Sequence, residues 1–84
     1  MIERTFGNFK GTVDPIAETV LVLGLRFGWK GLYSVDELPA KIAFYKRLIK
    51  KPQQSDRGRP AAVLKSYQET LSCLEWAARI LADG

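Results

Sequence analysis

The C-terminal quarter of the chain carries two apolar stripes at helical spacing, and they constrain the fold more than any other feature. The first stripe repeats every three or four residues and consists of Leu64, Tyr67, Leu71, Leu74, Ala78 and Leu81. The second comprises Cys73, Trp76, Ala77 and Ile80. It lies roughly opposite the first, because a helix turns about 100° per residue. A small domain can bury one of these faces, and the other needs a separate cover.

The length and composition predict one globular domain spanning residues 1–84. Apolar residues make up 46% and charged residues 26%, as in ordinary soluble proteins. The longest apolar run, residues 20–23, is far shorter than the roughly 20 residues that a membrane span requires. No signal core follows Met1, and the single cysteine, Cys73, has no partner for an internal disulfide. We therefore expect a cytoplasmic protein that does not contact membranes.

The first half of the chain is read as an arm followed by a helix. Residues 1–13 show no clear period and predict an extended arm, in which a short strand is one interpretation. Asp14 and Pro15 are typical of a helix start, which favours a helix over about residues 15–27. Residues 19–25 also suit a buried strand, because periodicity alone does not settle a short apolar run.

The second half predicts two further helices. Asp36 can cap a helix over about residues 37–51, with Pro39 in its first turn. Pro52 ends that helix, and residues 52–59 form a polar, basic connector. A third helix spans about residues 60–82. These elements predict a mainly α fold, a small three-helix bundle with an extended N-terminal arm.

Positive charge is concentrated in the middle of the sequence. Residues 41–65 contain eight basic residues and a single acid, Asp56, whereas the whole chain has a net charge of +4. Such a region attracts anionic partners. The candidate contacts for nucleic acid or another anionic partner are Lys46, Arg47, Lys50, Lys51, Arg57, Arg59 and Lys65.

A four-residue motif lies within this basic region. Residues 57–60, Arg-Gly-Arg-Pro, resemble the core of the AT-hook family, which places arginines in an A·T-rich minor groove. The resemblance implies that Arg57 and Arg59 enter the groove. Asp56 and Ala61 flank the motif where that family has more basic residues. A solvated turn before the third helix explains the same residues, and we favour that interpretation.

The sequence gives little support for enzyme chemistry. The chain has no histidine, no glycine-rich phosphate loop and a single cysteine, which removes the usual general base and zinc ligands. We therefore expect no catalytic residues, no metal site, no cofactor and no small-molecule substrate.

Two segments have both a structural and a functional interpretation. Residues 27–33 interleave aromatics, glycines and a lysine, so they either fill the space between helices or recognise bases or a peptide. The stripe formed by Cys73, Trp76, Ala77 and Ile80 either lies under the arm that carries Phe6 and Phe9, or binds another chain.

The leading functional hypothesis is a small non-enzymatic binding module. It would dock on itself or on a larger protein complex through the stripe around Trp76, as an accessory subunit or small inhibitor of a nucleic-acid-handling machine would. The alternative is direct binding of DNA or RNA through the basic residues of 41–65. The pattern of charge does not separate the two, since positive surfaces also attract acidic proteins.

Overall fold

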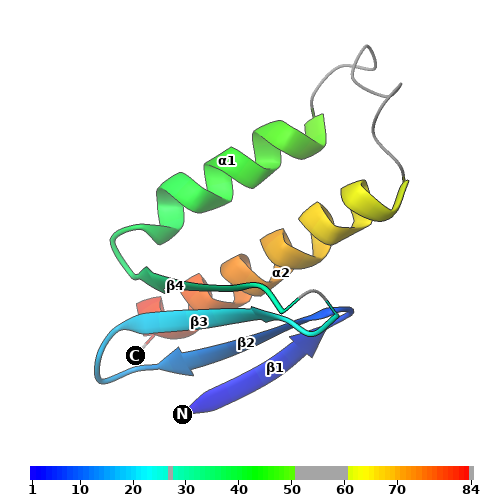
Figure 1. Ribbon diagram of the computed structural model, residues 1–84. Coiled ribbons are helices and arrows are strands. Elements are labelled where there is room, and N and C mark those ends of the chain that lie inside the picture. Colours follow the sequence, from blue (N-terminus) through cyan, green and yellow to red (C-terminus); the bar gives the residue numbers. More distant parts are fainter. Residues whose placement is uncertain (27, 51–60, 84) are drawn as a thin grey trace.

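The protein folds as an antiparallel sheet with two helices on one of its faces. The computed structural model describes residues 1–26, 28–50 and 61–83. In chain order the elements are β1 (Ile2–Phe6), β2 (Phe9–Asp14), β3 (Thr19–Gly24), β4 (Lys30–Ser34), α1 (Leu38–Lys50) and α2 (Ala61–Asp83). Figure 1 shows both helices on the same side of the sheet. The prediction of a mainly α three-helix bundle is therefore wrong, and the correct class is a mixed sheet-and-helix fold.

The N-terminal segment predicted as an arm is a β-hairpin. Strands β1 and β2 pair antiparallel, with Phe6 opposite Phe9. Gly7 and Asn8 form the two-residue connection, and Gly7 has a φ of 61°, which favours glycine. The alternation in β2 follows the pleat, since Phe9, Gly11 and Val13 are buried and the residues between them are half-buried.

The predicted helix over residues 15–27 is replaced by a loop and strand β3. The Asp14 Oδ1 atom accepts hydrogen bonds from the backbone N–H groups of Ile16 and Ala17, at 3.0 and 3.2 Å. Glu18 then adopts a φ of 57°, which reverses the chain into β3. Asp14 thus satisfies backbone donors, as predicted for a helix cap, but here it closes a hairpin loop. The alternative strand interpretation of residues 19–25 is confirmed over Thr19–Gly24.

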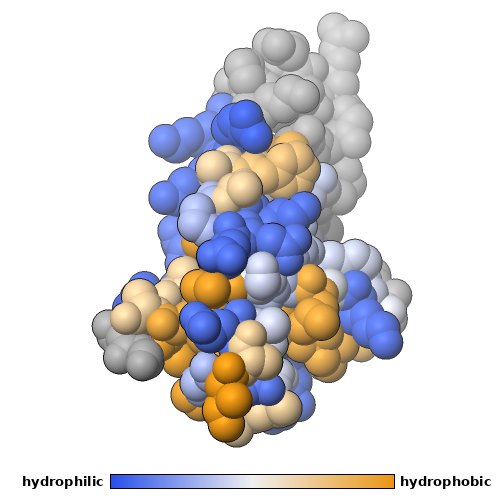
Figure 2. Space-filling view, turned by 90° about the vertical axis from the view of Figure 1, so that its left-hand side faces the viewer, coloured by the Kyte–Doolittle hydropathy of each residue, from blue (hydrophilic) through white to orange (hydrophobic). Residues whose placement is uncertain are grey.

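The sheet is a four-stranded meander with order β1-β2-β3-β4. Val13 pairs with Val20 and Gly11 with Val22, so these residues share the face that the helices cover. Val13, Val20 and Val22 are fully buried there. Viewed from one end, hydrophobic residues gather low on the molecule around the sheet, and hydrophilic residues dominate farther up (Figure 2).

Helix α1 begins where the sequence predicted, close to the end of β4. The Glu37 carboxylate accepts hydrogen bonds from the Ser34 backbone N–H at 2.9 Å and from the Ser34 hydroxyl at 3.2 Å. This contact fixes the tight turn between β4 and α1. Leu38, the first residue of the helix, is 1% exposed and anchors this corner in the core. The first turn tolerates Pro39, because its missing N–H has no helical partner there.

Helix α2 explains the two apolar stripes, because it lies between the sheet and α1 (Figure 1). Cys73 and Ala77, from the second stripe, are fully buried with the sheet residues of the core. Leu74, from the first stripe, is also fully buried, and the ring of Tyr67 lies 6.0 Å from that of Tyr45 on α1. The predicted helices over 37–51 and 60–82 therefore exist, but the second packs on the sheet.

In the described part of the chain, no helix combines the length and apolarity needed to cross a membrane.

Candidate functional site: an aromatic groove between the helices and the sheet

The stripe predicted to bind protein packs in large part within the chain itself. Cys73 and Ala77 are fully buried, and Ile80 packs against the core. The centroid of the half-buried Trp76 ring lies 5.5 Å from that of the Phe6 ring, and the Arg4 guanidinium carbon lies 5.2 Å from the Phe6 centroid. The N-terminal hairpin is thus the cover that the alternative interpretation required. The geometric reason for assigning this stripe to another chain no longer holds.

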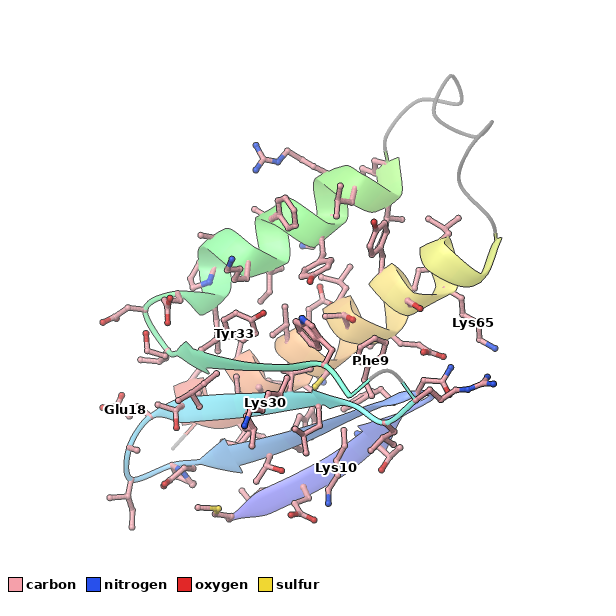
Figure 3. The ribbon with its side chains drawn as sticks, in the orientation of Figure 1. Phe9, Lys10, Glu18, Lys30, Tyr33 and Lys65 are labelled. Atoms are coloured by element: carbon pink, nitrogen blue, oxygen red, sulfur yellow. The ribbon has the colours of Figure 1, made fainter. Side chains whose placement is uncertain are left out.

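The predicted basic residues that the structure describes come from two helices, three of them from α1 and one from α2. Arg47 and Lys50 are exposed in the last turn of α1. Lys46 pairs with Glu75 of α2, with 3.7 Å between nitrogen and oxygen. Lys65 lies near the start of α2 (Figure 3), and it lines a hollow together with Phe6 and Gly7. The remaining predicted contacts, Lys51, Arg57 and Arg59, and with them the AT-hook-like motif, lie outside the described residues.

A different surface, which we call the aromatic groove, has the features of a binding site. It is an open groove of about 280 Å³ between α1, α2 and one end of the sheet. Its lining residues are Phe9, Trp29, Tyr45, Ser66, Tyr67 and Thr70. Figure 3 shows Phe9 on this inner side of the sheet, facing α2. Four aromatic rings in one concave surface offer a large contact area to an apolar ligand group.

The backbone of the β3–β4 connection fixes Trp29 on the sheet side of the groove. The Gly24 N–H donates to the Trp29 carbonyl at 2.5 Å, and the Leu25 N–H donates to the Asn8 carbonyl at 2.8 Å. Gly24 has no side chain, and a Cβ there would lie only 3.3 Å from the Trp29 Cβ. The Trp29 ring meets the Phe9 ring edge-on, with centroids 6.1 Å apart. Trp29 is nevertheless 38% exposed, so its ring remains open to a partner.

The helices supply the opposite wall and the floor. Tyr45 on α1 contacts the rings of Tyr67 and Phe44, at centroid distances of 6.0 and 5.3 Å. Burial raises the pKa of the Tyr45 hydroxyl, and the neighbouring Tyr33 and Tyr67 raise it further. Phe44 is 44% exposed and continues the apolar surface along α1 beyond the groove. The Tyr45 side of the groove is therefore neutral at physiological pH.

The floor offers little polar chemistry to a ligand. Thr70 is buried, and its hydroxyl already donates to the Ser66 carbonyl at 2.8 Å. No charged residue lines the groove among the residues described. Within that same part of the chain, no three His, Cys, Asp or Glu side chains are grouped as a metal site would need. The arrangement suits the burial of apolar groups rather than proton transfer or phosphate binding.

Most of this site was missed in the sequence. Trp29 belongs to the segment 27–33, for which recognition of a peptide or of bases was one interpretation. Phe9 was assigned to the arm, and Tyr45 and Thr70 fell within predicted helices without a proposed role. The missing signal was the two-residue alternation of Phe9, Gly11 and Val13 after a Gly-Asn pair, which is typical of a hairpin. Recognising that hairpin would have placed Phe9 opposite the third helix.

Comparison of the chain with protein-family models, curated proteins and solved structures finds no match.

Proposed function

We propose that this protein is a small non-enzymatic binding module that receives an apolar segment of a partner protein in the aromatic groove. The observation that carries the proposal is the groove itself, whose walls are four aromatic rings and whose described lining residues carry no charge. Binding hot spots are enriched in aromatic residues set in desolvated pockets. The groove replaces the stripe around Trp76 as the proposed contact surface.

The charge on α1 supports a partner with acidic residues beside its apolar anchor. This helix carries Lys41, Lys46, Arg47 and Lys50 and has no acidic residue. Lys41 lies 5.7 Å from the Tyr33 ring centroid, and Tyr33 extends from β4 toward α1 (Figure 3). A positive helix along one wall would speed association with an acidic segment, while the aromatic walls would supply the affinity.

The setting we propose remains cytoplasmic. Cys73 is fully buried and has no second cysteine to pair with in the sequence. Burial raises the pKa of its thiol to about 11, so the thiol is poorly reactive near neutral pH. A buried free cysteine of this kind is compatible with reducing conditions.

Selection of displayed random peptides on the full chain tests the proposal. The groove-filling variant is Ser66→Leu, which adds bulk to the floor, and the matched control is Ser72→Leu, on an exposed position of the same helix. We expect the native chain and the control to enrich the same peptides, with apolar anchors and acidic flanks. The groove-filling variant should bind them about tenfold more weakly or worse. Enrichment of no peptide, or equal binding to both variants, contradicts the proposal.

Direct binding of nucleic acid is the second candidate, and the absence of acids from α1 is the observation that favours it. Arg47 and Lys50 would contact phosphates, and affinity would fall steeply with salt because bound counterions are released. A mobility shift with single-stranded and duplex DNA at low salt tests this candidate. A shift that Arg47→Glu and Lys50→Glu abolish would favour it over the groove.

A further inference from the structure

The face of the sheet that points away from the helices has an apolar centre. Strand register places Thr12, Leu21 and Leu32 in one row across β2, β3 and β4. The next row contains Lys10, Leu23 and Lys30. Figure 3 shows Lys10 and Lys30 pointing to the side away from both helices. We call this surface, with Glu3, Asp14, Thr19 and Ser34 at its borders, the outer sheet face.

Strand β3 is apolar on both sides, although helices cover only one of them. Val20 and Val22 are fully buried beneath α2, while Leu21 and Leu23 on the outer sheet face are half-buried. An antiparallel strand with one solvated face normally alternates between apolar and polar residues, and a continuous apolar run is typical of a strand covered on both faces. Leu32 beside it is 64% exposed. The outer sheet face therefore needs a cover that the described chain does not supply.

The charges on this face indicate which cover fits. Lys10 and Lys30 lie in the row at one end of the strands. Asp14 lies in the row at the other end, and Glu3 lies in the middle row, where it pairs with Lys10 at 3.2 Å. Two cations and two acids balance on a chain whose net charge is +4. A strongly charged partner would gain no net electrostatic attraction from this face. A second copy rotated so that its strands run antiparallel places its row of lysines over the end that carries Asp14.

We propose that the outer sheet faces of two copies of this chain pack against each other with their strands antiparallel. This arrangement has two-fold symmetry and places the leucines of both copies at the centre. The aromatic groove lies on the opposite side of the sheet, so it stays open in the dimer. The dimer does not depend on what the groove binds.

The size of the face sets the strength of this association. Four strands about 4.8 Å apart and five or six residues long give a projected area of roughly 350 Å² on each copy. Stable interfaces bury about 800 Å² of accessible surface on each partner. The dimer therefore belongs to the weak class, and it should form in the micromolar to millimolar range rather than at nanomolar concentration.

Sedimentation equilibrium of the full chain, up to about 1 mM, measures this dimer. The disrupting variant is Leu32→Glu at the edge of the face, and the matched control is Phe44→Glu, which lies on α1 on the other side of the sheet and is 44% exposed. Circular dichroism verifies that both variants fold. We expect a monomer–dimer equilibrium that Leu32→Glu weakens about tenfold or more and that Phe44→Glu leaves within about twofold. A strictly monomeric chain, or a dimer insensitive to Leu32→Glu, overturns the proposal.

A charge reversal tests the antiparallel orientation. Lys30→Glu places a new acid opposite the acidic end of the other copy, so it should weaken the dimer, and added salt should restore part of the loss. Lys65→Glu makes the same change in net charge away from this face and is the matched control. A stronger dimer in both variants would mean that only the overall repulsion matters, which contradicts the proposed orientation.

Discussion

Gly11 on β2 and Cys73 on α2 meet so closely that a Cβ atom on Gly11 would lie 2.5 Å from the Cys73 Sγ atom. The same Cβ atom would lie 3.0 Å from the Trp76 ring. Cys73 is fully buried in the core, so its sulfur cannot move out into solvent to avoid this contact. The absence of a side chain at Gly11 therefore sets how near the long helix comes to the sheet.

Gly11→Ala should destabilise the protein by about 1–3 kcal/mol, as expected for overpacking a core. Chemical denaturation of the variant measures this loss. Combining it with Cys73→Ala should recover part of the loss, with a coupling of at least about 0.5 kcal/mol, because the clashing sulfur is removed. Strictly additive effects would mean that the helix and sheet are farther apart than described.

Leu74→Ala should cost about 2–5 kcal/mol of unfolding free energy, because the side chain is fully buried between α2 and the rest of the core. Leu25→Ala is the matched control, since Leu25 is 54% exposed and its loss should stay within about 0.5 kcal/mol. Thermal or urea unfolding of both variants gives the comparison. Equal stabilities would place Leu74 outside the core.

Stability should fall as pH rises from about 9 to about 11. The ordinary pKa of a thiol is 9.0, and burial raises that of Cys73 to about 11 in the folded protein. Between these values the Cys73 thiol ionises in the unfolded chain but keeps its proton in the folded chain. The free energy of unfolding therefore falls by about 2–3 kcal/mol. Burial also raises the pKa values of Tyr33 and Tyr45, which extends the loss above pH 10.

Urea unfolding of the native chain and of Cys73→Ala across this pH range separates these contributions. The variant should show little decline between pH 9 and 10 and keep the decline above pH 10. Identical profiles for the two proteins would show that Cys73 titrates normally and is accessible to water.

The Glu37 carboxyl should titrate below its ordinary pKa of 4.5. The Ser34 backbone N–H and hydroxyl both donate to the carboxylate and stabilise its charged form. The stabilisation is present above pH 4.5 and is lost as the pH falls through the lowered pKa. Carboxyl NMR titration measures this value, and Ser34→Ala should raise it part of the way, since the backbone donor remains. An unchanged value in the variant would exclude the hydroxyl as a contributor.

The helices after residue 36 were predictable because their signals are local. Pro39 in a first turn, Pro52 after a basic last turn and two apolar stripes placed both helices within a residue or two of their observed ends. The prediction of a helix over residues 15–27 was wrong for a physical reason. Asp14 satisfies the same backbone donors in a hairpin loop as in a helix cap, so the residue types alone do not separate the two structures.

The segment that covers the second stripe could not be predicted, because the contact joins residues far apart in the sequence. Cys73 and Trp76 were visibly apolar, but only the pairing of β1 with β2 shows that Phe6 is brought onto Trp76. The aromatic groove is non-local in the same way. Phe9, Trp29 and Tyr45 come from three separate elements, and no spacing in the sequence brings them together.

The most direct test of binding in the aromatic groove uses the two tryptophans as independent reporters. Trp29 lines the aromatic groove, and Trp76 packs on Phe6 at a separate surface. A peptide enriched by the displayed-library selection is titrated into the ¹⁵N-labelled chain, and both indole N–H resonances are followed by NMR. We expect the Trp29 resonance to shift and saturate with the peptide while the Trp76 resonance stays in place. A shift confined to Trp76 would place binding at the second stripe of α2 and contradict binding in the aromatic groove.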